Sequence, residues 1–210
     1  VAMDCERFGA EGITVHPRPD ERHITRQDVL DLAKVVTTEY NIEGYPNERF
    51  MDLVLGVKPT QATLVPDPPH VLTSNAGWDT KKHSVFLKEV VDEFKRNNIR
   101  TSIFMDPVVS MMESAAATGT DRIELYTESF AVEFEKGNKA GVLAYSETAK
   151  MASEYGLGIN AGHDLNLNNL HYFVKEVPNV LEVSIGHALI AEALYFGLQN
   201  VVGMYLQKLK

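Results

Sequence analysis

Short apolar segments alternate with longer amphipathic segments along almost the whole chain. The short segments are rich in apolar and β-branched residues, which is typical of buried strands. They predict seven strands, at Gly12–His16, Asn41–Gly44, Gln61–Val65, Arg100–Met105, Arg122–Thr127, Gly158–Ala161 and Glu182–Gly186.

The segments between these strands have the spacing of helices that bury one face. Thr25 with Asp28 three residues later predicts a capped helix start, and Asn47 predicts another. Asp106 before Pro107 predicts a third start, because proline suits the first helical position, and Gly156 predicts a helix end. The predicted inward faces are Val29, Leu32, Ala33 and Val36; Phe50, Leu53, Val54 and Val57; and Leu87, Val90, Val91 and Phe94.

Helical crossovers between consecutive strands indicate a parallel sheet, either doubly wound or closed into a barrel. Val1–Ala10 has the pattern of a helix end that runs into the strand at Gly12, which implies an earlier strand. Seven strands and one more make the (β/α)8 TIM barrel, which usually has ~250 residues. We therefore expect residues 1–210 to form a single α/β domain, a (β/α)8 barrel whose first strand is missing from this chain.

Composition narrows the possible partners. The chain is 44% hydrophobic and 23% charged, the mix of a globular protein, and its net charge at pH 7 is −9. This charge argues against nucleic acid or an anionic membrane as the main partner. No apolar run has the ~18 residues of a membrane span. The single cysteine, Cys5, predicts a reducing compartment such as the cytoplasm.

Polar residues gather where the predicted strands end, which is where a (β/α)8 barrel carries its chemistry. His16 and Arg18 follow the first predicted strand, Glu43 ends the second and His163 follows the sixth. Two histidines and a glutamate suit general acid–base catalysis, because histidine titrates near neutral pH and burial can tune a carboxyl group.

Other common chemistries lack their residues at these positions. No lysine lies at a predicted strand end, which disfavours a Schiff-base aldolase. No His-x-His or His-Glu-x-x-His pair is present, so we expect no metal site. No Gly-x-Gly-x-x-Gly follows a strand, which disfavours a dinucleotide-dependent enzyme.

Two places favour anionic groups. Gly186 and His187 open a predicted helix after the last strand, and a helix N-terminus offers free backbone N–H groups to a phosphate. Arg18 and His23 could supply charge to a second anionic group.

Each of these residues also has a plain structural interpretation. His16 fits a hydrogen-bonded core histidine, Glu43 fits an ion pair with Arg18, and His163 fits a simple turn. Glu124 alternates with apolar neighbours, and we interpret it first as a structural residue inside the barrel. The order of the whole set along the strands favours a functional site.

The strand-end motifs together resemble the pyridoxine 5′-phosphate synthase family, in order and over the whole chain. The motifs are Gly12–Arg18 (GITVHPR), Arg22–Ile24 (RHI), Asn41–Glu43 (NIE), Leu64–Pro66 (LVP), Asn160–His163 (NAGH) and Ser184–Ala188 (SIGHA).

The resemblance implies a transferase of vitamin B6 biosynthesis that condenses 1-deoxy-D-xylulose 5-phosphate with 3-amino-2-oxopropyl phosphate. The products are pyridoxine 5′-phosphate, phosphate and water, and the family uses neither a metal nor an organic cofactor. The resemblance also implies two small phosphorylated substrates and a homo-oligomer, in which dimers build an octamer.

Roles follow from the matching motifs. The resemblance makes His16 and Glu43 proton acceptors and His163 a proton donor. Implied substrate contacts are Arg18, His23 and Thr73 for the deoxyxylulose phosphate, Gly186 and His187 for the other phosphate, and the backbone of Asp164.

Two departures from the family pattern stand out. Asp164 occupies a position that is often glycine in the family, and the Asn-x-Asp-His motif of the family's first strand is not in this chain. Two other functions stay open on the residues alone: a phosphosugar isomerase or epimerase that uses Glu43 and a histidine, and a non-catalytic protein that binds pyridoxine phosphate.

Overall fold

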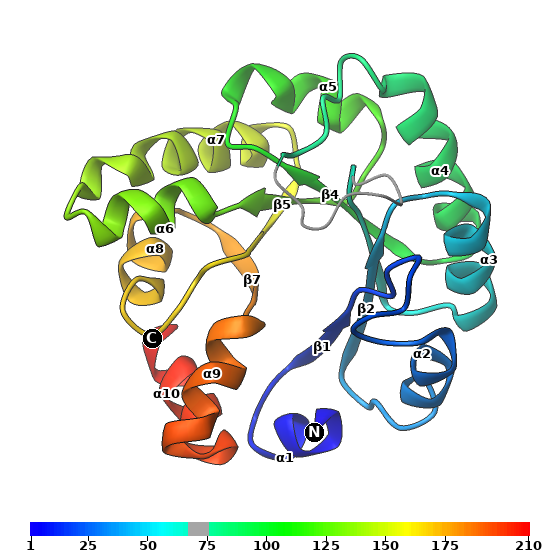
Figure 1. Cartoon of the computed structure of the whole chain (residues 1–210). Helices are drawn as coiled ribbons and strands as arrows, with labels where there is room; N and C mark the ends of the chain where they lie inside the picture. The colour runs from blue at the N-terminus through cyan, green and yellow to red at the C-terminus, as the bar shows by residue number, and fades with distance from the viewer. Residues whose placement is uncertain (67–75) are drawn as a thin grey trace.

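The computed structural model describes residues 1–66 and 76–210, and its centre is one sheet of seven parallel strands. Each strand pairs with the next along the chain, so that β1 and β7 form the two edges. Figure 1 shows the strands as a nearly closed ring with helices around it. The α/β barrel class predicted from the sequence is confirmed. The strands are β1 (Gly12–Val15), β2 (Glu39–Gly44), β3 (Gln61–Leu64), β4 (Arg100–Met105), β5 (Arg122–Tyr126), β6 (Gly158–Gly162) and β7 (Val180–Ser184).

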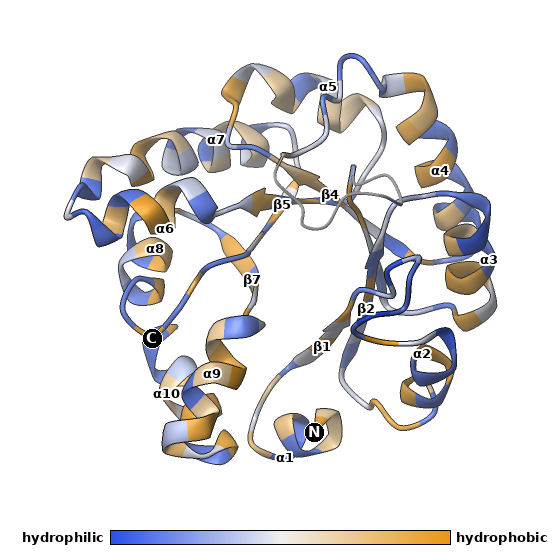
Figure 2. Ribbon diagram, viewed as in Figure 1, coloured by the Kyte–Doolittle hydropathy of each residue, from blue (hydrophilic) through white to orange (hydrophobic). Residues whose placement is uncertain are grey.

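The helices turn their apolar faces toward the sheet, as the colouring in Figure 2 shows for α3 and α4. In α4 the inward residues Leu87, Val90, Val91 and Phe94 are buried, as their spacing predicted. The helices are α1 (Ala2–Arg7), α2 (Arg26–Leu32), α3 (Glu48–Val57), α4 (Ser84–Arg96), α5 (Met112–Ala117), α6 (Glu128–Glu135), α7 (Leu143–Glu154), α8 (Leu170–Glu176), α9 (His187–Phe196) and α10 (Leu198–Lys208), with 3-10 turns η1 (Val109–Met111) and η2 (Lys139–Val142).

Two predicted helix starts are confirmed by their side-chain caps. The backbone N–H of Asp28 donates to Thr25 Oγ1 at 3.1 Å, and the backbone N–H of Thr25 donates to Asp28 Oδ2 at 2.8 Å. Asn47 Oδ1 accepts from the backbone N–H of Phe50 at 3.0 Å. Each cap satisfies amide groups that the first helical turn leaves without partners, and a cap contributes about 1 kcal/mol. These helices therefore begin where the loops after β1 and β2 end.

The predicted helix start at Asp106 is wrong. The Asp106 carboxylate accepts from the backbone N–H of Gly77 at 3.0 Å, so that it joins the β4 end to a neighbouring loop. A 3-10 turn follows at Val109, and the helix begins only at Met112. The backbone of Met105 and Asp106 also leaves no room for a Cβ atom at Gly77. The Asp106 carboxylate therefore binds the backbone N–H of Gly77 and does not cap a helix.

The hydrophobic core lies between the ring of strands and the helices. Ile42, Leu64, Ile103, Ile123 and Ile159, from five successive strands, are each fully buried there. Because side chains alternate along a strand, the residues next to them point into the ring. The outer faces of the strands thus supply the apolar packing.

Inside the ring, the amino-terminal ends of the strands carry a network of charged and amide groups. Arg100 forms an ion pair with Glu39 and donates from Nε to Gln61 Oε1 at 2.9 Å. Arg122 Nη1 lies 2.9 Å from Glu182 Oε2. Partly buried charges are tolerated when they are paired in this way. The amino-terminal ends of the strands therefore carry paired polar groups inside the ring.

Glu124 lies in the ring on β5 and is 1% exposed. Its Oε2 has no hydrogen-bond partner among the described residues, and its Oε1 occupies the space that a Cβ atom of Gly162 would need. Burial, followed by the charges of Glu43 and Glu182, raises the pKa of Glu124 well above its usual value. Folding therefore favours the neutral form of the Glu124 carboxyl group relative to the unfolded chain.

We expect Glu124→Gln, which mimics the protonated acid, to stabilise the protein increasingly as the pH rises from 5 to 8. Above the unfolded-state pKa of ~4.3 the unfolded chain loses this proton while the folded chain keeps it, so wild-type stability falls with rising pH. Thermal unfolding of both proteins across this range measures the difference. The control is Glu147→Gln, an exposed carboxylate on α7. A Glu124→Gln difference that is constant with pH would contradict a raised pKa of Glu124.

Candidate active site

Three strand ends bring two imidazoles to one carboxylate. His16 follows β1, Glu43 is on β2 and His163 follows β6. His16 Nδ1 lies 3.4 Å from Glu43 Oε1, and His163 Nε2 lies 4.0 Å from the same oxygen. Residues 120 positions apart in the chain thus meet at the carboxyl-terminal mouth of the barrel, where the strand order predicted them.

The Glu43 carboxylate is buried, but its neighbours keep it ionised. Burial raises its pKa, while His16, followed by His163 and Arg18, lowers it, and the net result lies below the ordinary value. Glu124 in the same interior has a raised pKa. Two carboxyl groups whose pKa values are pushed apart can act as one base and one acid.

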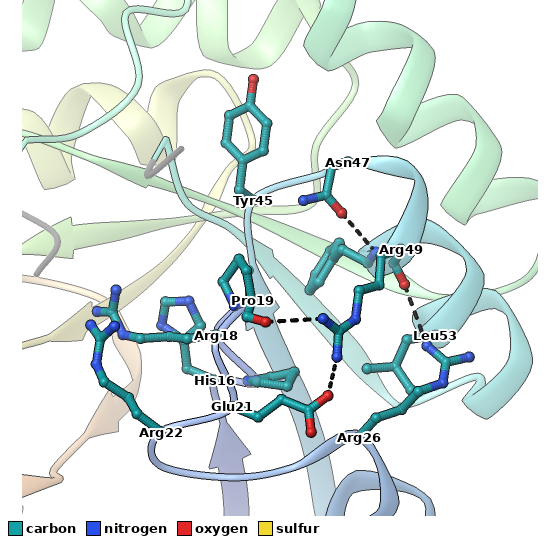
Figure 3. Close-up of a pocket in the computed structure, with 13 residues that line it drawn as sticks. His16, Arg18, Pro19, Glu21, Arg22, Arg26, Tyr45, Asn47, Arg49 and Leu53 are labelled. Carbon is teal, nitrogen blue, oxygen red and sulfur yellow. Dashed lines mark hydrogen bonds and ion pairs between the residues drawn. The ribbon is translucent and has the colours of Figure 1, made fainter. Parts of the chain in front are cut away.

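The loop after β1 carries Arg18 and is braced against α3. Arg49 Nη1 donates to the Pro19 carbonyl at 3.0 Å, and the same guanidinium forms an ion pair with Glu21. These contacts are drawn in Figure 3, where Arg18 extends away from Arg49. The brace holds the chain directly after His16, and a small cavity of about 40 Å³ lies between this loop and α3. The loop conformation therefore depends on helix α3.

His163 sits in a left-handed turn between two aromatic rings. Its φ is 72° and that of Asp164 is 57°, a conformation that side chains other than glycine rarely adopt. The His163 ring centroid lies 4.9 Å from that of Phe104 and 5.3 Å from that of Tyr126. Asp164 itself is exposed. The turn and the two rings together determine where the imidazole points.

The remaining predicted residues within the described ranges line the same large cavity as His16, Glu43 and His163. Gly186 directly precedes α9 and His187 is its first residue, as expected for a helix N-terminus. His23 Nε2 accepts from Arg22 Nε at 3.3 Å. Thr73 lies outside the described residues. One large cavity of about 2220 Å³ is lined by His16, Arg18, His23, Glu43, His163, Asp164, Gly186 and His187.

This cavity also reaches α1 and α10, so shared lining alone does not define a site. The contacts around Glu43 are more specific, because His16 and His163 are both neighbours of one buried carboxylate.

Three residues near the site were not identified as site residues from the sequence. The sequence pattern gives Glu124 a structural interpretation and places Tyr126 at the end of the fifth predicted strand without a role, and it gives no functional signal for Phe104. The alternation of side chains along β4 and β5 could have placed these three residues inside the ring, since all three lie on the strand face that points inward. What the sequence does not display is that Phe104 and Tyr126 contact His163.

No group of three or more His, Cys, Asp or Glu side chains in residues 1–66 and 76–210 could hold a metal ion. Within the same ranges, no helix is long and apolar enough to cross a membrane.

Solved structures with this fold include distant proteins. Thiamine phosphate pyrophosphorylase of Pyrococcus furiosus matches with a TM-score of 0.66 at 11% identity, over 99% of this chain and 87% of that chain. Monomers generated from the dimeric phosphoribosylanthranilate isomerase of Thermotoga maritima match with a TM-score of 0.63 at 13% identity, over 99% and 91%. At such low identity these matches establish the barrel fold alone.

Sequence relatives are much closer. The pyridoxine 5′-phosphate synthase of Flavobacterium johnsoniae is 63% identical over 210 residues, which cover 100% of this chain and 89% of the relative. The synthase of Christiangramia forsetii is 64% identical over 209 residues, covering 100% and 88%. The model of the family described as pyridoxal phosphate biosynthesis protein PdxJ matches residues 1–210. The chain belongs to the PdxJ family.

Proposed function

We propose that the chain is a pyridoxine 5′-phosphate synthase, a transferase that condenses 1-deoxy-D-xylulose 5-phosphate with 3-amino-2-oxopropyl phosphate. The products are pyridoxine 5′-phosphate, inorganic phosphate and water. The observation that carries this proposal is the pair of imidazoles, His16 and His163, around the buried Glu43 carboxylate. Family membership and relatives of 63% and 64% identity support the same reaction.

The reaction needs several proton transfers. An amine attacks a ketone, water and phosphate leave, and a ring closes. General acid–base groups serve these steps when they can both accept and donate protons near neutral pH. The ionised Glu43 and the adjacent His16 act as proton acceptors, and His163 acts as the proton donor. While Glu43 is ionised, its nearby oxygen stabilises an adjacent imidazole that carries a proton.

Two phosphorylated substrates need two anion sites. Arg18 and His23, on the braced loop after β1, bind the phosphate of the deoxyxylulose substrate, together with Thr73. Gly186 and His187, at the start of α9, bind the second phosphate through free backbone N–H groups. The backbone N–H of Asp164 contributes a further substrate contact. Neither the binding of the two phosphates nor the proposed proton transfers need a metal or an organic cofactor.

The proposal includes a homo-oligomer in which dimers build an octamer, with each chain a single barrel domain in the cytoplasm. Leu194 and Tyr195 on α9 are 82% and 86% exposed, and exposed apolar side chains of this size favour contact with another surface. Light scattering of the purified protein should give the mass of eight chains. The mass of a single chain at micromolar concentration would contradict the oligomer and leave the reaction unaffected.

Mixing the two substrates with the enzyme is the direct test of the function. We expect formation of pyridoxine 5′-phosphate with one inorganic phosphate released per product, measured by absorbance and a phosphate assay in the presence of a chelator. Folded protein that yields no product would overturn the proposal. Turnover of the sugar phosphate alone would indicate an isomerase or epimerase.

Glu43→Gln and His16→Ala should fold normally and lose at least ~10² in kcat, the usual contribution of a general acid–base group. Circular dichroism checks the fold and the product assay measures kcat. Lys150→Ala, on the exposed surface of α7, is the control and should keep wild-type kcat. If either site variant keeps near-wild-type turnover, that residue has no part in the proton transfers.

A further inference from the structure

The left-handed turn at His163 is held by side chains that the catalytic assignment does not use. His163 and Asp164 are consecutive residues with positive φ, at 72° and 57°. Such a conformation is unfavourable for residues other than glycine and persists only where surrounding contacts impose it. The contacts that impose it here can be named.

Thr127 holds the first half of the turn. It is fully buried at the end of β5, and its Oγ1 donates to the Gly162 carbonyl at 2.7 Å and also reaches the His163 carbonyl. The backbone N–H of Thr127 donates to the same Gly162 carbonyl at 3.1 Å. Two carbonyls, one on each side of the His163 Cα atom, thus accept hydrogen bonds from one residue that directly follows the neighbouring strand β5.

Asn169 holds the second half. It is 1% exposed, its Nδ2 donates to the Asp164 carbonyl at 3.1 Å, and its Oδ1 accepts from the backbone N–H of Asn166 at 2.8 Å. Three successive carbonyls, at residues 162, 163 and 164, are therefore bound by two buried polar side chains.

We propose that Thr127 is a positioning residue for the reaction: its hydroxyl fixes the His163 backbone so that the imidazole lies between Phe104 and Tyr126 and faces Glu43. The proposal rests on the proposed role of His163 as proton donor. The Thr127 side chain makes no cap hydrogen bond to α6, so its hydroxyl has no role in starting that helix. What the hydroxyl contacts is the turn that carries His163.

The test compares Thr127→Val with Thr127→Ser. Valine keeps the branched shape and removes the hydroxyl, while serine keeps the hydroxyl. We expect Thr127→Val to lower kcat by about 10- to 100-fold with KM for both substrates within about twofold, because small misplacements of a catalytic group cost up to ~10² in rate. Thr127→Ser should stay within about threefold of wild type.

The matched control is Thr148→Val on α7. Thr148 is also fully buried, but its Oγ1 has no hydrogen-bond partner among the described residues. The same chemical change at Thr148 should leave kcat and KM at wild-type values. If Thr127→Val does not fold, as judged by circular dichroism, Thr127→Cys keeps the size with only a weak donor, and we expect its kcat to fall between those of the serine and valine variants.

A second readout does not require turnover. Diethylpyrocarbonate modifies accessible imidazoles, and mass spectrometry follows the modified His163 peptide, with the exposed His171 as the internal reference. We expect His163 to react several-fold faster in Thr127→Val than in wild type, Thr127→Ser and Thr148→Val, because the released turn no longer holds the imidazole between its two rings. A wild-type protein that makes no product would remove the proposed function while this measurement still tests the turn.

Two results would overturn the positioning role. One is a folded Thr127→Val protein whose kcat and His163 modification rate match wild type. The other is a Thr127→Ser protein as impaired as Thr127→Val, since the effect would then come from the methyl group and not from the hydrogen bond.

Discussion

A charged carboxylate inside the barrel is the constraint on which the site depends. Glu43 has lost nearly all contact with water, and an ion in that position is costly unless opposite charge lies close by. His16 and His163 lie close to Glu43, directly after β1 and β6, and each supplies such a charge only when it is protonated. The carboxylate in turn attracts the charged form of each imidazole. The three side chains therefore interact electrostatically as one unit, and a proton gained by one group changes how readily the other two bind a proton.

Two carboxyl groups in the polar interior, those of Glu43 and Glu124, have pKa values that are shifted in opposite directions. Glu43 is surrounded by imidazoles and Arg18, whereas Glu124 has other carboxylates as its charged neighbours. Similar burial is therefore accompanied by a lowered pKa at Glu43 and a raised pKa at Glu124. Gly162 is part of this arrangement, because any side chain there would displace the Glu124 carboxyl group. A glycine that looks like a turn residue in the sequence thus leaves room for an acid on the neighbouring strand.

Much of the fold could be predicted from periodicity and caps. All seven strands and the helix starts at Thr25 and Asn47 follow local rules that the sequence displays. The helix start predicted at Asp106 failed because the carboxylate bonds to Gly77, 29 residues away, and local patterns carry no information about such contacts. The same holds for the site. Strand ends predicted that His16, Glu43 and His163 lie at one mouth, but the left-handed turn at His163, the rings beside it and the hydroxyl of Thr127 arise only from tertiary structure.

The apolar core of this barrel lies outside the ring of strands, against the helices, and the inward faces carry mostly polar groups. Along each strand, the outward residues thus pack against the helices, and the alternate, inward residues carry the polar groups of the interior. A substitution at Ile123 changes the apolar packing against the helices, whereas one at Glu124, its neighbour, changes the charge inside the ring beside Glu43. Because the two tasks are assigned to opposite faces, the interior of such a barrel can diverge toward new reactions while the shell that holds it together stays the same.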